Sequence, residues 1–66
     1  MDRIQTLRLF IRVVDLGSFS RAAREMGIGQ PAATKQVAQL EKRLGLHLLH
    51  RSTHGVTPTE IGALYY

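Results

Sequence analysis

The sequence predicts a mainly α-helical domain of the winged helix-turn-helix class, with three helices, a short β-hairpin wing and the start of a fourth helix. Three successive segments place apolar residues at helical spacing, and glycines separate them. The connector Gly27-Ile28-Gly29 is so short that the helices on either side of it must cross sharply. A fourth segment instead alternates in polarity around a polar turn, which is typical of a hairpin.

The first helix is predicted over Arg3–Leu16, and Gly17 ends it. Its apolar residues cover most of the circumference, which is normal for a helix that packs on two sides. We therefore expect its second side to meet another helix or another subunit. One face carries Ile4, Leu7, Ile11 and Val14, and the apolar surface continues over Leu9, Phe10, Val13 and Leu16.

The second helix is predicted to start after Ser18, a good N-cap residue, and to end at Gly27. Its apolar residues lie on one face and its polar residues on the other, as expected for a helix at the surface of a small core. The inward residues are Phe19, Ala22, Ala23 and Met26, and the outward residues are Ser20, Arg21 and Arg24.

The third helix is predicted from about Gln30-Pro31 to the stop at Gly45, with proline in the first turn. An ordinary solvated helix would crowd its outer face with long charged side chains in i, i+4 pairs. Here small alanines alternate with amides and lysines, so the backbone can approach a flat acidic surface. The inner stripe is Ala33, Val37, Leu40 and Leu44, and the outer face is Pro31, Ala32, Lys35, Ala38, Gln39 and Lys42.

The hairpin is predicted from two short strands, Leu46–Arg51 and Val56-Thr57, around the turn Ser52-Thr53-His54-Gly55. Pro58 confines the second strand to an edge. The last helix starts either with a capping box at Thr57, which places Pro58 at the first helical position, or with Thr59 as the cap.

The positive charge of the chain is concentrated in one segment. The 66 residues carry a net charge of +4, and the whole excess lies between Ser18 and Pro58. Such a surface is expected to meet phosphate or an anionic membrane, although a solvated basic face would show the same charge balance. The basic residues of this segment are Arg21, Arg24, Lys35, Lys42, Arg43 and Arg51.

Composition excludes several classes of protein. The chain has no cysteine, so neither a disulfide framework nor a thiolate zinc site is available. No apolar run approaches the length that crosses a bilayer, and no secretory signal opens the chain, so we expect a cytoplasmic protein with no membrane contact. A chain this short, with scattered acids, is not expected to be an enzyme or to hold a cofactor.

Three histidines, His47, His50 and His54, raise the possibility of a metal site. Strand alternation places His47 and His50 on different faces, and no cysteine or acid joins them. We therefore expect no metal and interpret these histidines as surface residues of the hairpin.

Several motifs in register resemble the N-terminal DNA-binding domain of LysR-type transcriptional regulators. The resemblance spans essentially the whole chain. The motifs are Leu7-Arg8-Leu9-Phe10, Gly17-Ser18-Phe19-Ser20-Arg21-Ala22-Ala23, Gln30-Pro31-Ala32, Gln39-Leu40-Glu41, Leu44-Gly45, Leu48-Leu49-His50-Arg51 and Thr59-Glu60-Ile61-Gly62. Departures from the family's usual pattern are Gly29, where Ser or Thr commonly caps the recognition helix, His54, where Arg or Lys is common, and Pro58, where Leu is common.

The resemblance implies a sequence-specific DNA-binding domain of a bacterial regulator over residues 1–58, followed by the start of a linker and dimerisation helix over residues 59–66. The chain stops in mid-pattern, so we expect it to be part of a longer protein whose effector domain is absent. The family implies double-stranded operator DNA as partner, homo-oligomers through the linker helix, and a small-molecule co-inducer bound by the effector domain.

The resemblance also implies which residues contact DNA. The recognition helix, about residues 30–44, would enter the major groove, and the wing, about residues 51–55, would lie near the minor groove or the backbone. Matching positions in the recognition helix are Gln30, Pro31, Thr34, Lys35 and Gln36. Elsewhere they are Ser20 and Arg21 at the start of the preceding helix, and Arg51, Thr53 and His54 in the wing.

The chemistry of these side chains agrees with the implied roles. Gln pairs with adenine, Lys donates to guanine and a Thr methyl contacts a thymine methyl, while Arg most often contacts phosphate. The alternative from another class is a small basic helical module that docks an acidic protein. Such a module would need a broad exposed apolar patch, whereas the third helix presents alanines and amides there.

Overall fold

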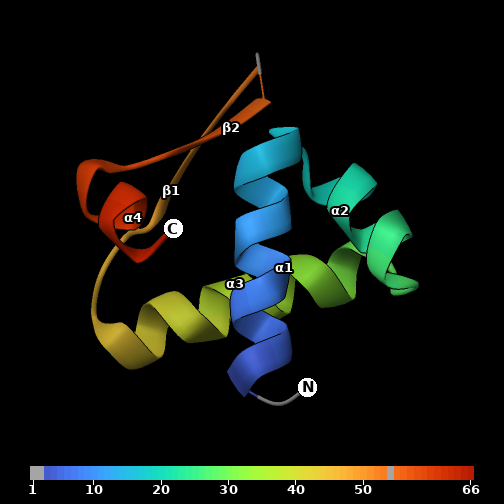
Figure 1. Ribbon diagram of the computed structural model, residues 1–66, viewed down its shortest axis with the longest axis horizontal. Helices are drawn as coiled ribbons and strands as arrows, with labels where there is room; N and C mark the ends of the chain where they lie inside the picture. Colours follow the sequence, from blue (N-terminus) through green and yellow to red (C-terminus); the bar gives the residue numbers. More distant parts are fainter. Residues whose placement is uncertain (1–2, 54) are drawn as a thin grey trace.

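The computed structural model describes residues 3–53 and 55–66 and confirms the predicted order of elements (Figure 1). The architecture is mainly α-helical, with a two-stranded antiparallel sheet as the wing. The elements are α1 (Arg3–Leu16), α2 (Phe19–Met26), α3 (Gln30–Leu44), β1 (Leu49–Ser52), β2 (Gly55–Pro58) and α4 (Glu60–Tyr65).

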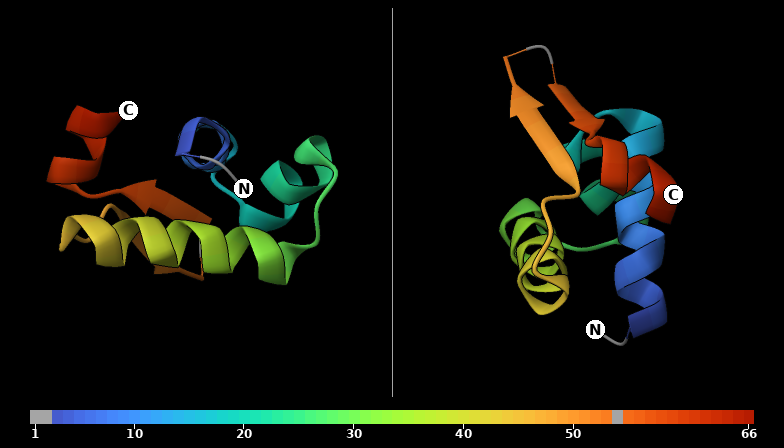
Figure 2. Two further views of the ribbon diagram at one scale, coloured as in Figure 1. Left: turned by 90° about the horizontal axis from the view of Figure 1, so that it is seen from below. Right: turned by 90° about the vertical axis from the view of Figure 1, so that its left-hand side faces the viewer.

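The first three helices pack against one another, and the hairpin attaches to the side of this bundle. In the left view of Figure 2, α1 is seen nearly end-on while α3 runs lengthwise, so these two helices cross steeply. Strand β2 contacts both α1 and α4. The hairpin therefore stands beside the end of α1, with α4 at its base (Figure 1).

Glycine and serine fix the helix ends where the sequence predicts them. Gly27 and Gly45 close α2 and α3 in the left-handed conformation. Ser18 caps α2, since its Oγ accepts a hydrogen bond from the backbone N–H of Arg21 at 3.2 Å. Helix α3 begins after Gly29, which offers no side chain for a cap, and Pro31 lies in its first turn.

The core is built from α1, α2, α3 and the residues that lead into β1. Each helix contributes one apolar stripe, and Leu48 and Leu49 close the core from the wing side. The buried apolar residues are Leu9, Phe10, Val13, Phe19, Ala22, Ala23, Ala33, Val37, Leu40, Leu48 and Leu49.

The most deeply buried face of α1 is not the one that carries Ile4, whose exposed fraction is 65%. The buried stripe instead runs through Thr6, Leu9, Phe10 and Val13. On a helix that is apolar nearly all round, periodicity cannot rank the two faces, and packing on α2 and α3 decides between them. The other face is partly buried through Leu7, Ile11 and Val14.

The inner stripe of α3 is confirmed for Ala33, Val37 and Leu40 but is wrong for Leu44, which is 36% exposed. Leu44 is the last residue of α3. It lines a shallow apolar depression together with residues from the start of α1 and from α4.

The predicted hairpin forms, but its strands differ from the prediction. Strand β1 runs over Leu49–Ser52 rather than Leu46–Arg51, and β2 runs over Gly55–Pro58 rather than Val56-Thr57. The carboxylate of Glu41 accepts the backbone N–H groups of Leu48 and Leu49 through Oε2, at 2.8 and 3.3 Å. This α3 side chain thus satisfies the amide just before β1 and the amide of its first residue. At the far strand, the N–H of Val56 donates to the carbonyl oxygen of Gly17 at 3.1 Å.

Thr59, not Thr57, is the cap of α4, so the capping-box alternative is wrong. Its Oγ1 accepts from the N–H of Gly62 at 3.0 Å and donates to the carbonyl oxygen of His47 at 2.7 Å. Thr57 instead belongs to β2, where it pairs with His50.

Gly62 brings α4 against the backbone that leads into β1. A Cβ added to it would lie 2.0 Å from the carbonyl oxygen of Leu48. This position therefore has room for no side chain. None of the helices in the described ranges is long and apolar enough to cross a membrane.

Candidate nucleic-acid interface

The outer face of α3 is exposed and contains no large apolar side chain. All six residues that the sequence places there are exposed. The helix is therefore held by its inner stripe alone and can be approached along most of its length. These outer residues are Pro31, Ala32, Lys35, Ala38, Gln39 and Lys42.

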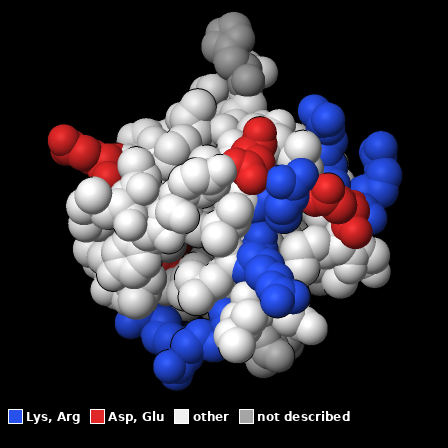
Figure 3. Space-filling view, viewed as in Figure 1, with Lys and Arg blue, Asp and Glu red and all other residues white. Residues whose placement is uncertain are grey.

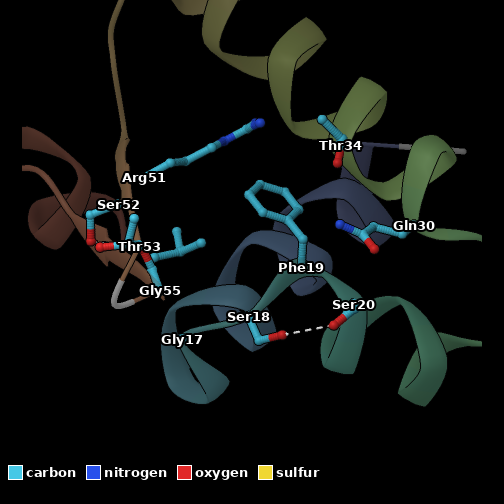
Figure 4. A pocket seen from close by; sticks show the side chains of 11 residues that line it. Gly17, Ser18, Phe19, Ser20, Gln30, Thr34, Arg51, Ser52, Thr53 and Gly55 are labelled. Carbon is cyan, nitrogen blue, oxygen red and sulfur yellow. Dashed lines mark hydrogen bonds between the residues drawn. The ribbon is translucent and has the colours of Figure 1, made fainter.

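An open depression of about 480 Å³ lies between the start of α2, the start of α3 and the wing (Figure 4). Five of the predicted DNA-binding residues line it, although they come from three separate parts of the chain. These five are Ser20, Gln30, Thr34, Arg51 and Thr53, and the other lining residues are Gly17, Ser18, Phe19, Ser52, Gly55 and Val56.

The remaining predicted residues lie outside this depression. Arg21, Pro31 and Lys35 are exposed on α2 and α3, while Gln36 is half-buried. His54 is outside the described residues. The structure therefore brings the start of each helix together with the wing, and leaves Lys35 further along the outer face of α3.

The side chains of the depression are polar, and none of its lining residues is an acid. Ser18 Oγ and Ser20 Oγ lie 3.1 Å apart at the start of α2, as the dashed line in Figure 4 shows. Arg51 supplies the one full positive charge of this lining. The depression is thus suited to an anionic group.

Arg51 makes a contact that the sequence analysis missed. Its guanidinium carbon lies over the ring of Phe19, 4.4 Å from the ring centroid. Phe19 is 6% exposed, and its place on the apolar face of α2 predicts a core residue alone. The two residues are far apart in the chain, so helical or strand spacing does not connect them.

Arg12 of α1 forms ion pairs both within its own helix and with α2. The guanidinium of Arg12 donates to Glu25 at 2.6 and 3.1 Å and to Asp15 at 2.9 Å. The hydrogen bond from Arg12 lowers the pKa of Glu25, and the same bond raises the pKa of Arg12. Figure 3 shows acidic atoms directly beside basic ones.

Asp15 also binds the last residue of the chain. The hydroxyl of Tyr66 donates to Asp15, which raises the pKa of Tyr66. By contrast, no ion pair among the described residues involves Lys35, Lys42 or Arg51. Both α3 and the wing thus carry cations that form no ion pair in the described part of the chain.

Neither His47 nor His50 belongs to a cluster of possible metal ligands among the described residues. Both are exposed. In the described ranges, 3–53 and 55–66, no group of three or more His, Cys, Asp or Glu residues is placed to hold a metal ion.

Comparison with known proteins identifies relatives over nearly the whole chain. The family model described as bacterial regulatory helix-turn-helix protein, lysR family, matches residues 4–63. The nitrogen assimilation regulatory protein nac of Escherichia coli is 47% identical over 60 residues, which are 91% of this chain and 20% of that protein. The transcriptional regulator AbaB of Streptomyces antibioticus is 52% identical over 56 residues, 85% of this chain and 19% of that protein. The chain spans about a fifth of the length of the curated relatives it matches.

Solved structures with bound DNA are also similar to nearly the whole chain. The DNA-binding domain of BenM in complex with catB site 1 DNA is 38% identical, with a TM-score of 0.92, over 100% of this chain and 73% of that one. Full-length CbnR in complex with its target DNA is 35% identical, with a TM-score of 0.89, over 98% of this chain and 22% of that one.

Proposed function

The chain belongs to the bacterial LysR family of helix-turn-helix regulators, which are not enzymes, and from this premise we propose that it binds operator DNA through α3 and the wing. Helix α3 enters the major groove, and the wing lies near the minor groove or the phosphate backbone. The observation that carries this proposal is the depression shared by the starts of α2 and α3 and by the wing, which has a cation and no acid in its lining.

Base contacts are assigned to the N-terminal half of α3. Gln30 and Lys35 are exposed there, and Thr34 is half-buried at the edge of the depression. Their side chains supply an adenine-pairing amide, a guanine donor and a methyl group for thymine. Pro31 lies within this set and Gln36 follows it, and both belong to the part of the helix that meets the groove.

Phosphate contacts are assigned to the start of α2 and to the wing. Ser20 and Arg21 lie in the first turn of α2, and Arg51 and Thr53 lie at the wing side of the depression. Contacts of this kind fix the register of a protein on DNA without reading sequence. The sequence pattern adds His54 to the same group.

We also propose that residues 1–58 form the DNA-binding domain and that residues 59–66 start a linker helix that joins two copies. The exposed residues Leu44 and Tyr65 support this, because they line an apolar depression that also includes Leu7 of α1. In the intact protein an effector domain would bind a small-molecule co-inducer, and the protein would act in the cytoplasm, where bacterial DNA lies.

The alternative, a module that docks an acidic protein, has no observation in its favour. The outer face of α3 offers alanines and amides rather than an apolar patch.

The test is a selection of bound sites from a random duplex library with the intact protein, followed by affinity for the selected site and for random duplex. We expect one preferred site and a binding constant that falls steeply with salt, since phosphate contacts release counterions. Binding to neither duplex at low salt would overturn the proposal.

A further inference from the structure

Arg51 is exposed, and its side chain extends across the depression. In Figure 4 its side chain runs from β1 toward Thr34 of α3, past the ring of Phe19. Its guanidinium carbon is 4.4 Å from the centroid of that ring, a distance typical of a cation–π contact. Arg51 forms no ion pair with any acid in the described ranges.

The ring that Arg51 meets is itself fixed. Phe19 is the first residue of α2, is 6% exposed and belongs to the core cluster. Arg51 pairs with Val56 across the hairpin, and the N–H of Val56 is bonded to the carbonyl oxygen of Gly17, two residues before Phe19. Backbone and ring therefore hold both ends of the arginine side chain.

We propose that Phe19 is a positioning residue for DNA binding, whose ring holds the guanidinium of Arg51 in place to bind one backbone phosphate between α3 and the wing. This inference rests on the proposed function. It adds a residue that neither touches DNA nor belongs to the outer face of α3.

The geometry of a guanidinium explains why a ring suits this role. All five N–H donors of arginine lie in the plane of the group, so stacking on a ring leaves them available for the two oxygens of a phosphate. A stacked arginine also loses less side-chain freedom when DNA binds. The hydroxyl group of Ser20, which lines the same depression, is placed to join this phosphate contact.

The test is a double-mutant cycle in the intact protein with Phe19→Leu, Arg51→Gln and the double variant. Affinity for a random duplex is measured between about 50 and 200 mM salt. We expect Arg51→Gln to reduce the slope of log affinity against log salt by about 0.9 for each DNA-binding domain. Phe19→Leu should weaken binding about threefold to tenfold when Arg51 is present, and should have no effect when Arg51 is replaced.

A core variant on α1, Val13→Ala, is the matched control. Val13 is fully buried and does not line the depression. We expect this variant to lower the unfolding temperature while the salt slope stays at the wild-type value. Equal weakening by Phe19→Leu with and without Arg51 would show that Phe19 acts through the core alone and would overturn the inference.

A second measurement needs no substitution of Phe19. In NMR spectra of the wild type, the side-chain protons of Arg51 should carry the ring-current shift of an aromatic neighbour, and this shift should persist when duplex is added. Its loss on DNA binding would mean that the guanidinium leaves the ring, which contradicts the inference. If the wild type binds no duplex, the proposed function itself fails, and the two failures are thereby distinguished.

Discussion

The proposed DNA-contacting side chains at the start of α3 differ in how far they are buried. Gln30 and Lys35 are exposed, and neither belongs to the core cluster. Their substitution should therefore separate DNA recognition from folding, which a half-buried residue such as Thr34 cannot do as cleanly.

Gln30→Ala and Lys35→Ala are each expected to lower affinity for the selected operator by about 1–3 kcal/mol, the usual value of one good base contact. Affinity for random duplex should fall less, and the unfolding temperature should stay within a degree or two of wild type because exposed substitutions rarely change stability. Equilibrium binding to both duplexes, together with thermal unfolding, measures this.

Gln39→Ala is the control for these two variants. Gln39 is exposed on the same outer face of α3 but lies in its C-terminal half. The Gln39→Ala variant should prefer the operator over random duplex as strongly as wild type does. Wild-type preference in Gln30→Ala and Lys35→Ala would show that other residues read the bases.

At the scale of the elements, α4 and the residues that lead into β1 contact each other through their backbones rather than through side chains. Helix α4 lies so near the residues that lead into β1 that Gly62 meets the carbonyl of Leu48. An alanine in a helix interior normally stabilises a protein by about 1 kcal/mol relative to glycine. Here the clash should reverse that sign.

Gly62→Ala is expected to lower the free energy of unfolding by about 1–3 kcal/mol, the usual cost of overpacking. Urea unfolding measures it. Ala63→Gly is the matched control, since Ala63 is exposed on the same helix, and it should cost about 1 kcal/mol through helix propensity alone. A stability gain in Gly62→Ala would contradict the close junction.

Helices α1 and α2 are joined at their surfaces by Arg12 and Glu25. Because Arg12 lowers the pKa of Glu25, the pair stabilises the fold above the usual carboxyl pKa, and this contribution is lost as the pH falls through the lower, folded-state pKa. We expect the unfolding temperature of Glu25→Gln to fall less than that of wild type between about pH 7 and pH 3. In an Arg12→Gln background the substitution should leave the pH profile unchanged, and a persistent difference there would assign the effect to other groups.

The sequence predicted the element boundaries well because glycine and serine act locally. Gly27 and Gly45 end the helices that directly precede them, and Ser18 caps the helix that directly follows it. It did not predict the late start of β1, because a carboxylate on α3, Glu41, takes two of the amides. Contacts between distant segments carry no periodic signal.

For the candidate site, the sequence predicted which residues come together but not every contact between them. Five of the proposed DNA-binding residues converge on one depression, as the order of elements and the family resemblance imply. The cation–π contact of Arg51 with Phe19 was not predictable, since it depends on how the wing packs beside α2.

Over the whole molecule, most of the cations outside ion pairs lie on α2, α3 and the wing. Within the described ranges the ion pairs join Arg12 of α1 to Asp15 and Glu25, whereas Arg21, Lys35, Lys42 and Arg51 form none. The electrostatic attraction of DNA should therefore act on one side of the molecule and leave the other free for contacts with protein.

Arg21→Ala tests this division of charge. It should weaken binding to operator and to random duplex by similar factors and reduce the salt slope by about 0.9 for each domain. Arg8→Ala removes the same charge from the exposed surface of α1 and should leave the slope unchanged. Equal slopes in the two variants would mean that net charge alone governs binding.

The hydrogen bond from the N–H of Val56 to the carbonyl oxygen of Gly17 makes the attachment of the wing measurable by hydrogen exchange. An amide on an edge strand normally exchanges its proton with water quickly, whereas this one is held by the end of α1. Its exchange rate therefore measures how often the wing separates from the helices. We expect this proton to exchange more slowly once DNA is bound, because a wing seated on a duplex has less freedom to open.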